Sequence, residues 1–285
     1  MGILRSFSFV VLEFTEEWVK LAFFKSKGKL PRVSIGKKNI EKQKDEQVEK
    51  AVKDLFAEFR ISRRLPVFVI IPRRLVTIRN LKLPSVSRDE LSEMARLQAA
   101  KQLPYPPNEL ISDYRVIKKT PDGYSHLALA IAHRNVIERY LTILDNARVS
   151  PEQITVSSEA LIEWFMATKA ASKKSPGPTA IIDIDSSFAE VAITEGGGLQ
   201  LSRSFSYHAP NNWKEKLQDE IKKTFFAYEK DTSRSISSAI VTGIEESGLW
   251  LNQALLKDFK IKDSEYVHPL RITSADYKQG LSRHM

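Results

Sequence analysis

Residues 180–184 read Ala-Ile-Ile-Asp-Ile, an apolar run interrupted by a single carboxylate. A short run of this kind is typical of a strand that is buried on both faces of a sheet. Two further β-rich runs follow at residues 188–194 and 199–205, joined by three glycines that begin at Gly196. The three runs predict an antiparallel meander, with the glycines as a hairpin turn.

A helix and another buried strand are expected next. Residues 213–228 carry four apolar residues at helical spacing, which are Leu217, Ile221, Phe225 and Tyr228. Residues 239–242 are again apolar and predict a strand. The order is therefore meander, helix and strand.

The beginning of the chain has the same order. Two β-rich runs, an amphipathic helical pattern and a short apolar run follow one another at residues 10–13, 18–24, 45–59 and 67–71. Ile181 follows Val10 by 171 positions, and the later buried strands lie about as far apart. The sequence therefore predicts two related units.

A different block separates the two units. A strand over residues 76–83 ends before Pro84, and Ser87 with Glu90 predicts a capping box for a helix over residues 88–102. We expect this helix to bury the face that carries Leu91, Met94, Leu97 and Gln98.

The rest of this block alternates between strand and helix. Strands at residues 112–117 and 124–132 and a helix at residues 135–147 are predicted. Pro151 is expected to open a connector helix that continues to Ala171, and residues 171–178 have the composition of a linker.

Composition excludes several classes of protein. The chain has 285 residues and no cysteine, so a disulfide framework, a cysteine-rich zinc module and a cysteine nucleophile are all excluded. The apolar runs are far shorter than a membrane-spanning helix. The five histidines show no ligand spacing, and no Walker A loop or G-x-S-x-G motif occurs, so no metal site and no catalytic residue is predicted.

Eight short stretches together carry a resemblance to a known family. They lie at residues 83–84, 90–91, 103–106, 113–116, 158–161, 180–184, 202–205 and 241–243. The most specific of them are Leu83-Pro84 and Leu103-Pro104-Tyr105-Pro106, which precede and follow the helix of the middle block. In this order the stretches resemble the PilM family, the actin-like component of type IV pilus assembly platforms, with GspL-like proteins of secretion platforms close behind.

The resemblance implies an α/β, actin-like (ribonuclease-H-like) fold with two lobes, an inserted α+β subdomain and a reduced second lobe. Residues 1–66 would form the first part of the first lobe, 67–149 the insertion, 150–177 the connector helix and linker, and 178–285 the second lobe. The short stretch between Phe205 and Leu217 leaves no room for the subdomain that closes over the nucleotide in actin-like ATPases.

The resemblance also locates the nucleotide motifs, and they are degenerate. Glu13 stands at the family's Asp and Thr15 at a Gly of the first phosphate turn. In the second turn Asp183 is retained but Asp185 replaces a Gly, which adds a Cβ atom and a negative charge. The adenosine-side motif keeps Gly243 and has Ile244 where relatives carry glycine. We therefore expect no enzymatic activity, a pseudo-ATPase, and no ATP or magnesium cofactor.

The implied function is that of a scaffold at the cytoplasmic side of the inner membrane, peripheral to it, in a type IV pilus or type II secretion platform. In the family, the cytoplasmic tail of a bitopic, PilN-like partner docks between the first lobe and the insertion. The candidate partner-binding residues here are Leu83, Pro84, Leu103, Pro104 and Tyr105. An assembly ATPase is a second expected partner, and self-association is expected to give at most a weak dimer.

The net charge of +9 includes one regional cluster. Its members are Arg63, Arg64, Arg73 and Arg74, with lysines 25, 27, 29, 37 and 38 in the early loops. The cluster has neither stacking aromatics along a groove nor a recognition helix, so nucleic acid is not expected. A solvated surface and docking to anionic lipid or to an acidic partner segment remain as alternatives.

Two other functions remain open at this point. One is an ATP-binding, actin-like switch or filament-forming protein. The other is the cytoplasmic domain of a GspL-like bitopic protein whose membrane helix would follow Met285. The residues alone do not separate a pilus from a secretion system.

Overall fold

The structure, a computed structural model, describes residues 7–26, 31–40, 44–167, 177–186, 188–207 and 212–269. These residues divide into two compact units. The first contains the described residues up to Leu75 together with residues 133–157, and the second contains residues 76–132 and the described residues from Ser158 onward. Each unit has its own buried core.

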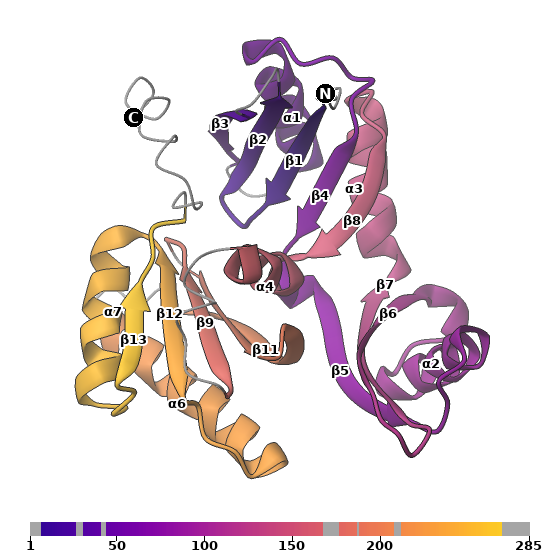
Figure 1. The fold of residues 1–285 in the computed structure, drawn as a ribbon. Helices are drawn as coiled ribbons and strands as arrows, with labels where there is room; N and C mark the ends of the chain where they lie inside the picture. Colours follow the sequence, from indigo (N-terminus) through magenta and orange to yellow (C-terminus); the bar gives the residue numbers. More distant parts are fainter. Residues whose placement is uncertain are drawn as a thin grey trace, which may run out of the picture. The chain divides into compact units, whose positions relative to one another are not determined.

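A five-stranded sheet in the order β3-β2-β1-β4-β8 forms the first unit (Figure 1). Its strands are β1 (Ser8–Phe14), β2 (Trp18–Ser26), β3 (Pro31–Asn39), β4 (Val67–Ile71) and β8 (Pro151–Val156). The first three form an antiparallel meander, whereas β4 pairs in parallel with both β1 and β8. A parallel pair needs a crossover, which α1 (Asp45–Glu58) provides between β3 and β4.

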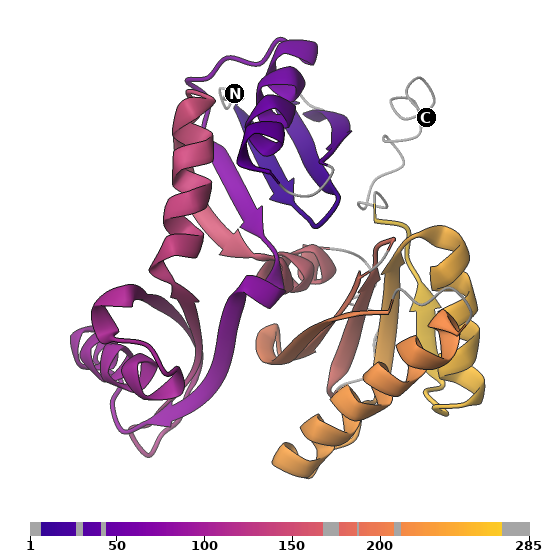
Figure 2. The same cartoon turned by 180° about the vertical axis from the view of Figure 1, so that it is seen from behind.

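Helices α1 and α3 (Arg134–Asn146) cover one face of this sheet (Figure 2). Val10, Leu12 and Phe14 alternate along β1 and are at most 2 % exposed. The ring of Phe14 lies 4.9 Å from that of Tyr140 on α3, and Leu55 of α1 is fully buried. Because side chains alternate along a strand, the residues between them point to the opposite face.

Two predictions about this unit are wrong. Residues 67–149 do not all belong to the insertion, because β4 pairs with β1 and α3 packs beside α1. The separate sheet is confined to residues 76–133. Pro151 opens strand β8 and not a helix, since proline is tolerated as the first residue of a strand and β-branched residues follow it. The helix begins at Ser157 as α4 (Ser157–Ala167). Most of the predicted linker, residues 171–176, lies outside the described residues.

The insertion is a three-stranded sheet in the order β5-β7-β6 with one helix. Its elements are β5 (Val76–Leu83), α2 (Arg88–Gln102), β6 (Leu110–Lys119) and β7 (Ser125–His133). Short 3-10 helices at Arg73–Leu75 and Pro107–Glu109 precede β5 and β6. The predicted strands and helix are therefore present.

The buried face of α2 differs from the prediction. Leu91, Ala95 and Ala99 are at most 3 % exposed, whereas Leu97 is 58 % exposed. The alanines bring the helix close to Leu110, Leu129 and Ile131 of the sheet. The capping box is also absent: the Ser87 side chain makes no capping bond, and the Ser85 hydroxyl donates to Glu90 instead.

The second five-stranded sheet has the order β11-β10-β9-β12-β13. Its strands are β9 (Thr179–Ile184), β10 (Phe188–Glu195), β11 (Gly198–Ser206), β12 (Ser238–Gly243) and β13 (Asp263–Tyr266), with helices α6 (Trp213–Thr232) and α7 (Glu245–Lys257). The four residues of the predicted α6 stripe are all buried in its core. Gly196 and Gly197 have positive φ values of 60° and 81°, which suit the predicted hairpin turn.

The two sheets repeat one topology. In each, an antiparallel meander is followed by a helix and by a strand that pairs in parallel with the first strand of the meander. The repeat predicted from residues 10 and 181 is therefore confirmed, and so is the α/β architecture with two lobes.

Candidate functional site

The first predicted phosphate turn joins β1 to β2 and is closed by Thr15. The Thr15 hydroxyl oxygen accepts hydrogen bonds from the backbone N–H groups of Trp18 at 3.0 Å and Glu17 at 3.3 Å. The backbone N–H of Thr15 donates to the Trp18 carbonyl at 2.9 Å. A turn that binds phosphate needs free N–H groups. Here three of them are already used within the turn.

The carboxylates of this turn have cationic partners. Glu13 lies 3.6 Å from the ammonium of Lys20, directly across the β1–β2 pair. Glu16 forms an ion pair with Arg74, whose side chain is 29 % exposed. Burial lowers the pKa of the Arg74 guanidinium, and nearby Arg139 lowers it further. Glu16 therefore gives Arg74 a local counter-charge.

The second predicted phosphate turn follows β9 and is also internally bonded. The Asp185 backbone N–H donates to the Phe188 carbonyl at 2.9 Å, and its carboxylate accepts from the Ser186 N–H at 2.8 Å. The Tyr207 hydroxyl donates to the Asp185 carbonyl. The Asp185 carboxylate thus accepts the Ser186 N–H, a backbone donor that a phosphate in this turn would need.

Asp183 belongs to a polar cluster on one face of the second sheet. It lies in register with Glu190 on β10 and with Thr242 on β12. Glu190 is 8 % exposed and accepts a hydrogen bond from the fully buried Ser158, the second residue of α4. The hydroxyl of Thr242 is buried and makes no hydrogen bond within the described residues. Among those residues, no group of three or more metal-ligating side chains comes together.

The third motif, at Gly243 and Ile244, is packed tightly onto β9. Gly243 has φ +98°, and a Cβ atom there would lie 2.1 Å from the carbonyl oxygen of Ile184. That same oxygen accepts the N–H of Ile244 at 2.9 Å. Glycine is therefore required at this position by strand packing alone.

Acidic residues occupy the start of α7, directly after this motif. Glu245 and Glu246 lie in the first turn, where negative charge stabilises the helix dipole. Desolvation raises the pKa of Tyr266, and the charges of Glu245 and Asp183 raise it further. The Tyr266 hydroxyl donates to the Gly243 carbonyl at 3.0 Å. The carboxylates of Glu245 and Glu246 would repel an anionic ligand at this turn.

The predicted partner-binding residues lie at the two ends of α2. Leu83 is buried before the helix, and Leu103 packs against the core after it. Pro84, Pro104 and Tyr105 are exposed, the last by 45 %. A helix of this length separates its ends by roughly 22 Å, so the five residues form two small surfaces.

The predicted basic cluster is also divided. Arg63 and Arg64 precede β4, whereas Arg73 and Arg74 follow it. A five-residue strand spans roughly 17 Å, which separates the two pairs. The Arg73 backbone N–H donates to Ser157 at 2.9 Å, and Arg74 is paired with Glu16. Lys27 and Lys29 lie outside the described residues.

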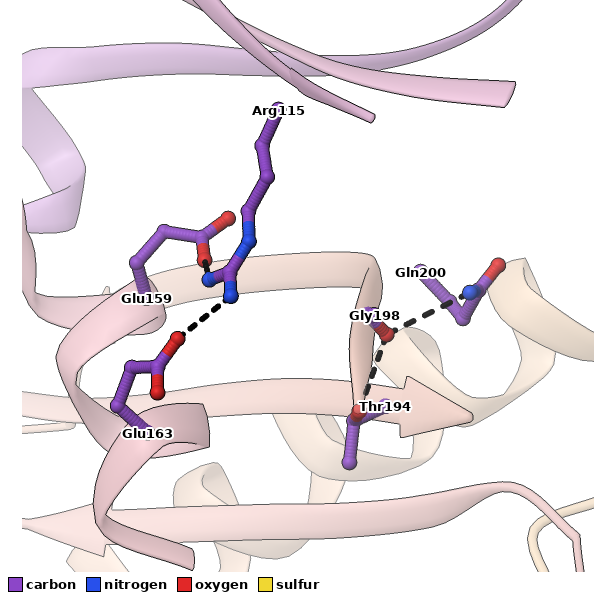
Figure 3. Close-up of polar contacts among 6 residues, drawn as sticks. All are labelled: Arg115, Glu159, Glu163, Thr194, Gly198 and Gln200. Carbon is purple, nitrogen blue, oxygen red and sulfur yellow. Dashed lines mark hydrogen bonds and ion pairs between the residues drawn. The ribbon is translucent and has the colours of Figure 1, made fainter. Parts of the chain in front are cut away.

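Sequence reasoning missed an ion-pair fork between the insertion and α4 (Figure 3). The guanidinium of Arg115 on β6 contacts Glu159 at 2.8 Å and Glu163 at 2.6 Å, one helical turn apart on α4. These two carboxylates raise the pKa of Arg115, Glu163 most strongly. Arg115 and Glu159 both lie in stretches that carry the family resemblance, but nothing in the sequence pairs them.

Two further contacts tie the insertion to β11. The side-chain amide of Asn80 on β5 donates to the backbone carbonyls of Leu199 and Gln200. A Cβ atom at Gly198 would lie 2.3 Å from the Ile117 side chain, so the glycine permits this approach. Figure 3 shows Gly198 at the hairpin, where its carbonyl accepts the Thr194 hydroxyl at 3.0 Å.

A family model described as type IV pilus assembly protein PilM matches residues 9–227, well over half of the chain. The chain belongs to the PilM family. The match includes both predicted phosphate turns, the insertion and α4. None of the curated proteins compared with the sequence matches it.

Solved structures agree with this PilM-like fold. A chain of a PilM–PilN type IV pilus biogenesis complex is 16 % identical with a TM-score of 0.76, covering 91 % of this chain and 88 % of that one. A Bacteroides thetaiotaomicron protein with an actin-like ATPase fold is 14 % identical with a TM-score of 0.56, covering 91 % and 90 %. The cytoplasmic domain of EpsL, an inner-membrane component of the Vibrio cholerae type II secretion system, is 8 % identical with a TM-score of 0.53, covering 83 % and 81 %. At these identities the matches show the actin-like fold.

In the described residues, no helix has the length and apolar character needed to cross a membrane.

Proposed function

We propose that this PilM-family protein is a non-catalytic scaffold of a type IV pilus assembly platform, located in the cytoplasm at the inner membrane. It binds no nucleotide and holds the cytoplasmic tail of a bitopic, PilN-like membrane protein. The observation that carries this proposal is the closure of the first phosphate turn by Thr15, within a chain of this family.

The second lobe supports the same proposal. The Asp185 carboxylate accepts the backbone N–H of Ser186 within its own turn. The backbone N–H of Ile244 donates to the carbonyl of Ile184 on β9. A phosphate at either turn would have to replace these bonds and approach the carboxylates of Asp185 or Glu245. Strand β11 ends at Ser206 and α6 begins at Trp213, so few residues are left for a subdomain that closes over a nucleotide.

The partner follows from the family. The PilM chain with the similar fold was solved in a complex with PilN. In this chain the exposed residues of the two Leu-Pro stretches, namely Pro84, Pro104 and Tyr105, are the proposed contacts for the tail. A short segment bound there would use backbone pairing and small apolar pockets. An assembly ATPase is a further proposed partner of the platform.

Calorimetric titration with Mg-ATP tests the first half of the proposal. We expect no heat of binding and no shift of the melting temperature at saturating nucleotide. Micromolar binding that is abolished by Asp183→Ala would replace the scaffold with an ATP-binding switch. The double variant Thr15→Gly/Asp185→Gly removes the two side chains that accept backbone N–H groups within the predicted phosphate turns. Gain of ATP binding in this variant would identify these side chains as the block.

A binding assay with the tail of the PilN-like partner tests the second half. Tyr105→Ala combined with Pro104→Ala is expected to weaken binding of a fluorescent tail peptide about tenfold or more, as loss of an aromatic anchor does. Leu97→Ala is the matched control, because Leu97 is an exposed apolar residue on the same subdomain. Equal affinity of both variants would exclude these residues as the contact.

A further inference from the structure

Strand β3 is an outermost strand of the first sheet, and within the described residues only β2 pairs with it (Figure 1). It is nine residues long, whereas strands of about five or six residues are usual. Its pairing with β2 continues without a register shift along the whole strand. A long edge strand without a bulge is a ready template for the addition of another strand.

One hydrogen bond fixes which backbone groups of β3 point to the open edge. The N–H of Ile40, directly after β3, donates to the Glu17 carbonyl at 2.8 Å, on the side of β2. In an antiparallel pair, every second residue directs its backbone groups to the same neighbour. The even-numbered residues of β3 therefore bond to β2. Val33, Ile35 and Lys37 direct their N–H and C=O groups to the edge, where the described chain provides no strand to pair with them.

The side chains of β3 alternate between the two faces of the sheet. A Cβ atom on Gly36 would lie 2.5 Å from the ring of Phe59, the residue that ends α1, so the even-numbered residues face α1. The odd-numbered residues lie on the opposite face, where Val33 is partly buried and Ile35 is 40 % exposed. A strand added to β3 would therefore gain most from apolar side chains opposite these two residues.

Positive charge is concentrated in the hairpin that β2 and β3 form. Residues 18–40 contain no Asp or Glu and seven cations, which are Lys20, Lys25, Lys27, Lys29, Arg32, Lys37 and Lys38. Lys25 and Arg32 are exposed and directly opposite each other, a like-charge pair that destabilises a sheet by itself. Neither has a carboxylate partner within the described residues, whereas Lys38 pairs with Glu58 at 2.6 Å.

A second copy of this chain does not fit the edge. Antiparallel pairing of two β3 strands about a two-fold axis at Ile35 would place Arg32 opposite Lys38 of the second copy, and Val33 opposite its Lys37. Each hairpin would contribute seven cations and no carboxylate to this contact. Lysine at an edge prevents pairing between copies of one chain. The same charge attracts a strand of opposite charge.

We propose that β3 binds an acidic, extended protein segment by strand addition. The segment has one carboxylate beside Arg32, on the side of α1, and one beside Lys37, whose ammonium lies 4.3 Å from the centre of the Trp18 ring on the other face. Apolar residues lie opposite Val33 and Ile35. In the antiparallel direction the segment reads acidic, any, apolar, any, apolar, acidic.

This binding surface is separate from the one proposed for the membrane partner. The residues proposed to contact the partner tail, Pro84, Pro104 and Tyr105, belong to the second unit, whereas β3 belongs to the first. A carboxylate beside Arg32 would also relieve the repulsion between Arg32 and Lys25. The segment therefore supplies the charge that the hairpin itself lacks.

Fluorescence polarisation of the full chain with labelled peptides tests the proposal. The peptide SETVTVES has the expected pattern and should bind at least about tenfold more tightly than SKTVTVKS, in which lysines replace the glutamates. SEETTVVS has the composition of the first peptide without its alternation, and it should bind about tenfold more weakly. Hydrogen exchange of the Val33, Ile35 and Lys37 amides should slow on binding of SETVTVES. The amides of Ser34 and Gly36 already bond to β2 and should change little.

Variants of the edge separate its charge from its backbone groups. Arg32→Glu/Lys37→Glu should weaken binding of SETVTVES about tenfold or more and strengthen binding of SKTVTVKS by a similar factor. Lys216→Glu/Lys230→Glu is the control, because it makes the same change of charge at exposed positions of α6; it should alter binding less than about twofold at physiological salt. Ile35→Pro removes one N–H from the edge and should cost about tenfold, whereas Ile35→Thr keeps the N–H and should cost about threefold.

Four results would overturn the proposal. Three of them are equal affinity for SETVTVES and SKTVTVKS, equal affinity for SETVTVES and SEETTVVS, and unchanged exchange of the odd-numbered amides. The fourth is a dimer in sedimentation that Ile35→Pro dissociates, which would assign the edge to a second copy. Should Ile35→Pro fail to fold, the reversal of peptide preference in Arg32→Glu/Lys37→Glu decides the question.

Discussion

The backbone of Gly243 approaches that of Ile184 so closely that a Cβ atom on Gly243 would lie 2.1 Å from the Ile184 carbonyl oxygen. This glycine belongs to the motif that the family resemblance assigns to the adenosine side of a nucleotide site. In this protein its presence is explained by the contact between β12 and β9. A retained motif residue is therefore no evidence for a retained ligand.

Gly243→Ala should consequently be strongly destabilising. A Cβ clash with backbone, added to a φ of +98°, is expected to cost about 3 kcal/mol or more in the free energy of unfolding. Gly123→Ala is the control, because Gly123 has φ +83° but nothing within 4 Å of the added atom. Its cost should be about 1 kcal/mol. Urea denaturation of the two variants measures the difference, and equal losses would contradict the close approach.

Removal of the Thr15 hydroxyl tests the closed phosphate turn. Thr15→Val keeps the shape of the side chain but leaves the N–H groups of Glu17 and Trp18 without their acceptor. We expect a loss of about 1 to 2 kcal/mol. Thr120→Val is a comparison in a turn of the insertion, where the lost hydroxyl donates to a carbonyl and to a carboxylate instead. Hydrogen exchange of the Trp18 amide should accelerate only in the Thr15 variant.

The fork at Arg115 predicts a modest, salt-dependent stabilisation. Arg115 and Glu163 are 52 % and 61 % exposed, so solvent screens their interaction, whereas Glu159 is 20 % exposed. Double-mutant cycles with Arg115→Met are expected to give at most about 0.5 kcal/mol for Glu163→Gln and about 1 kcal/mol for Glu159→Gln. The surface pair of Arg96 and Glu93 is the control cycle. A larger coupling for Glu163 would contradict the ranking by exposure.

The strands and most helices could be predicted because their side chains show clear periodicity. The stripe at Leu217, Ile221, Phe225 and Tyr228 is buried as the sequence predicts. The face of α2 was predicted wrongly because Ala95 and Ala99 carry little hydrophobic contrast, yet their small size is what brings the helix onto its sheet. Helix α7 and strand β13 were not predicted at all. The four residues of β13, Asp263–Tyr266, are polar or aromatic, and the strand pairs through its backbone with β12.

Contacts between distant residues are the part of the candidate sites that the sequence does not contain. Spacing can indicate an ion pair within one helix, but Arg115 and Glu159 meet only because β6 and α4 lie side by side. The backbone N–H groups that donate to the side chains of Thr15 and Asp185 are likewise set by the backbone path of each turn. The substitutions themselves were visible in the sequence, whereas their physical consequence required the structure.

Ionisation of a buried tyrosine should make the protein less stable at high pH. Burial raises the pKa of Tyr140. The pKa of Tyr140 in the folded state therefore exceeds the value of about 10 in the unfolded state. The contribution of this group to the free energy of unfolding is fully present below a pH of about 10 and is lost as the pH rises through the folded-state pKa. Tyr140→Phe should flatten this decline in the free energy of unfolding, since the ionisable group is gone. Urea unfolding of the wild type and of the variant across this pH range measures the difference.

The start of α2 offers a test between two adjacent serines. The sequence pattern favours Ser87 as the capping residue, but its side chain makes no capping bond. The Ser85 hydroxyl instead accepts the Ser87 N–H at 3.0 Å and donates to Glu90. Ser85 is 5 % exposed, so its loss leaves a partly buried donor and acceptor unpaired.

Ser85→Ala is therefore expected to cost about 1 to 2 kcal/mol in the free energy of unfolding, and Ser87→Ala less than about 0.5 kcal/mol. Glu90→Gln should weaken the same contact without removing its acceptor, so its cost should fall between the two. Thermal and urea unfolding of the three variants measure this order. The reverse order, with Ser87→Ala the most costly, would show that a capping box forms in solution and that Ser85 is incidental to the helix start.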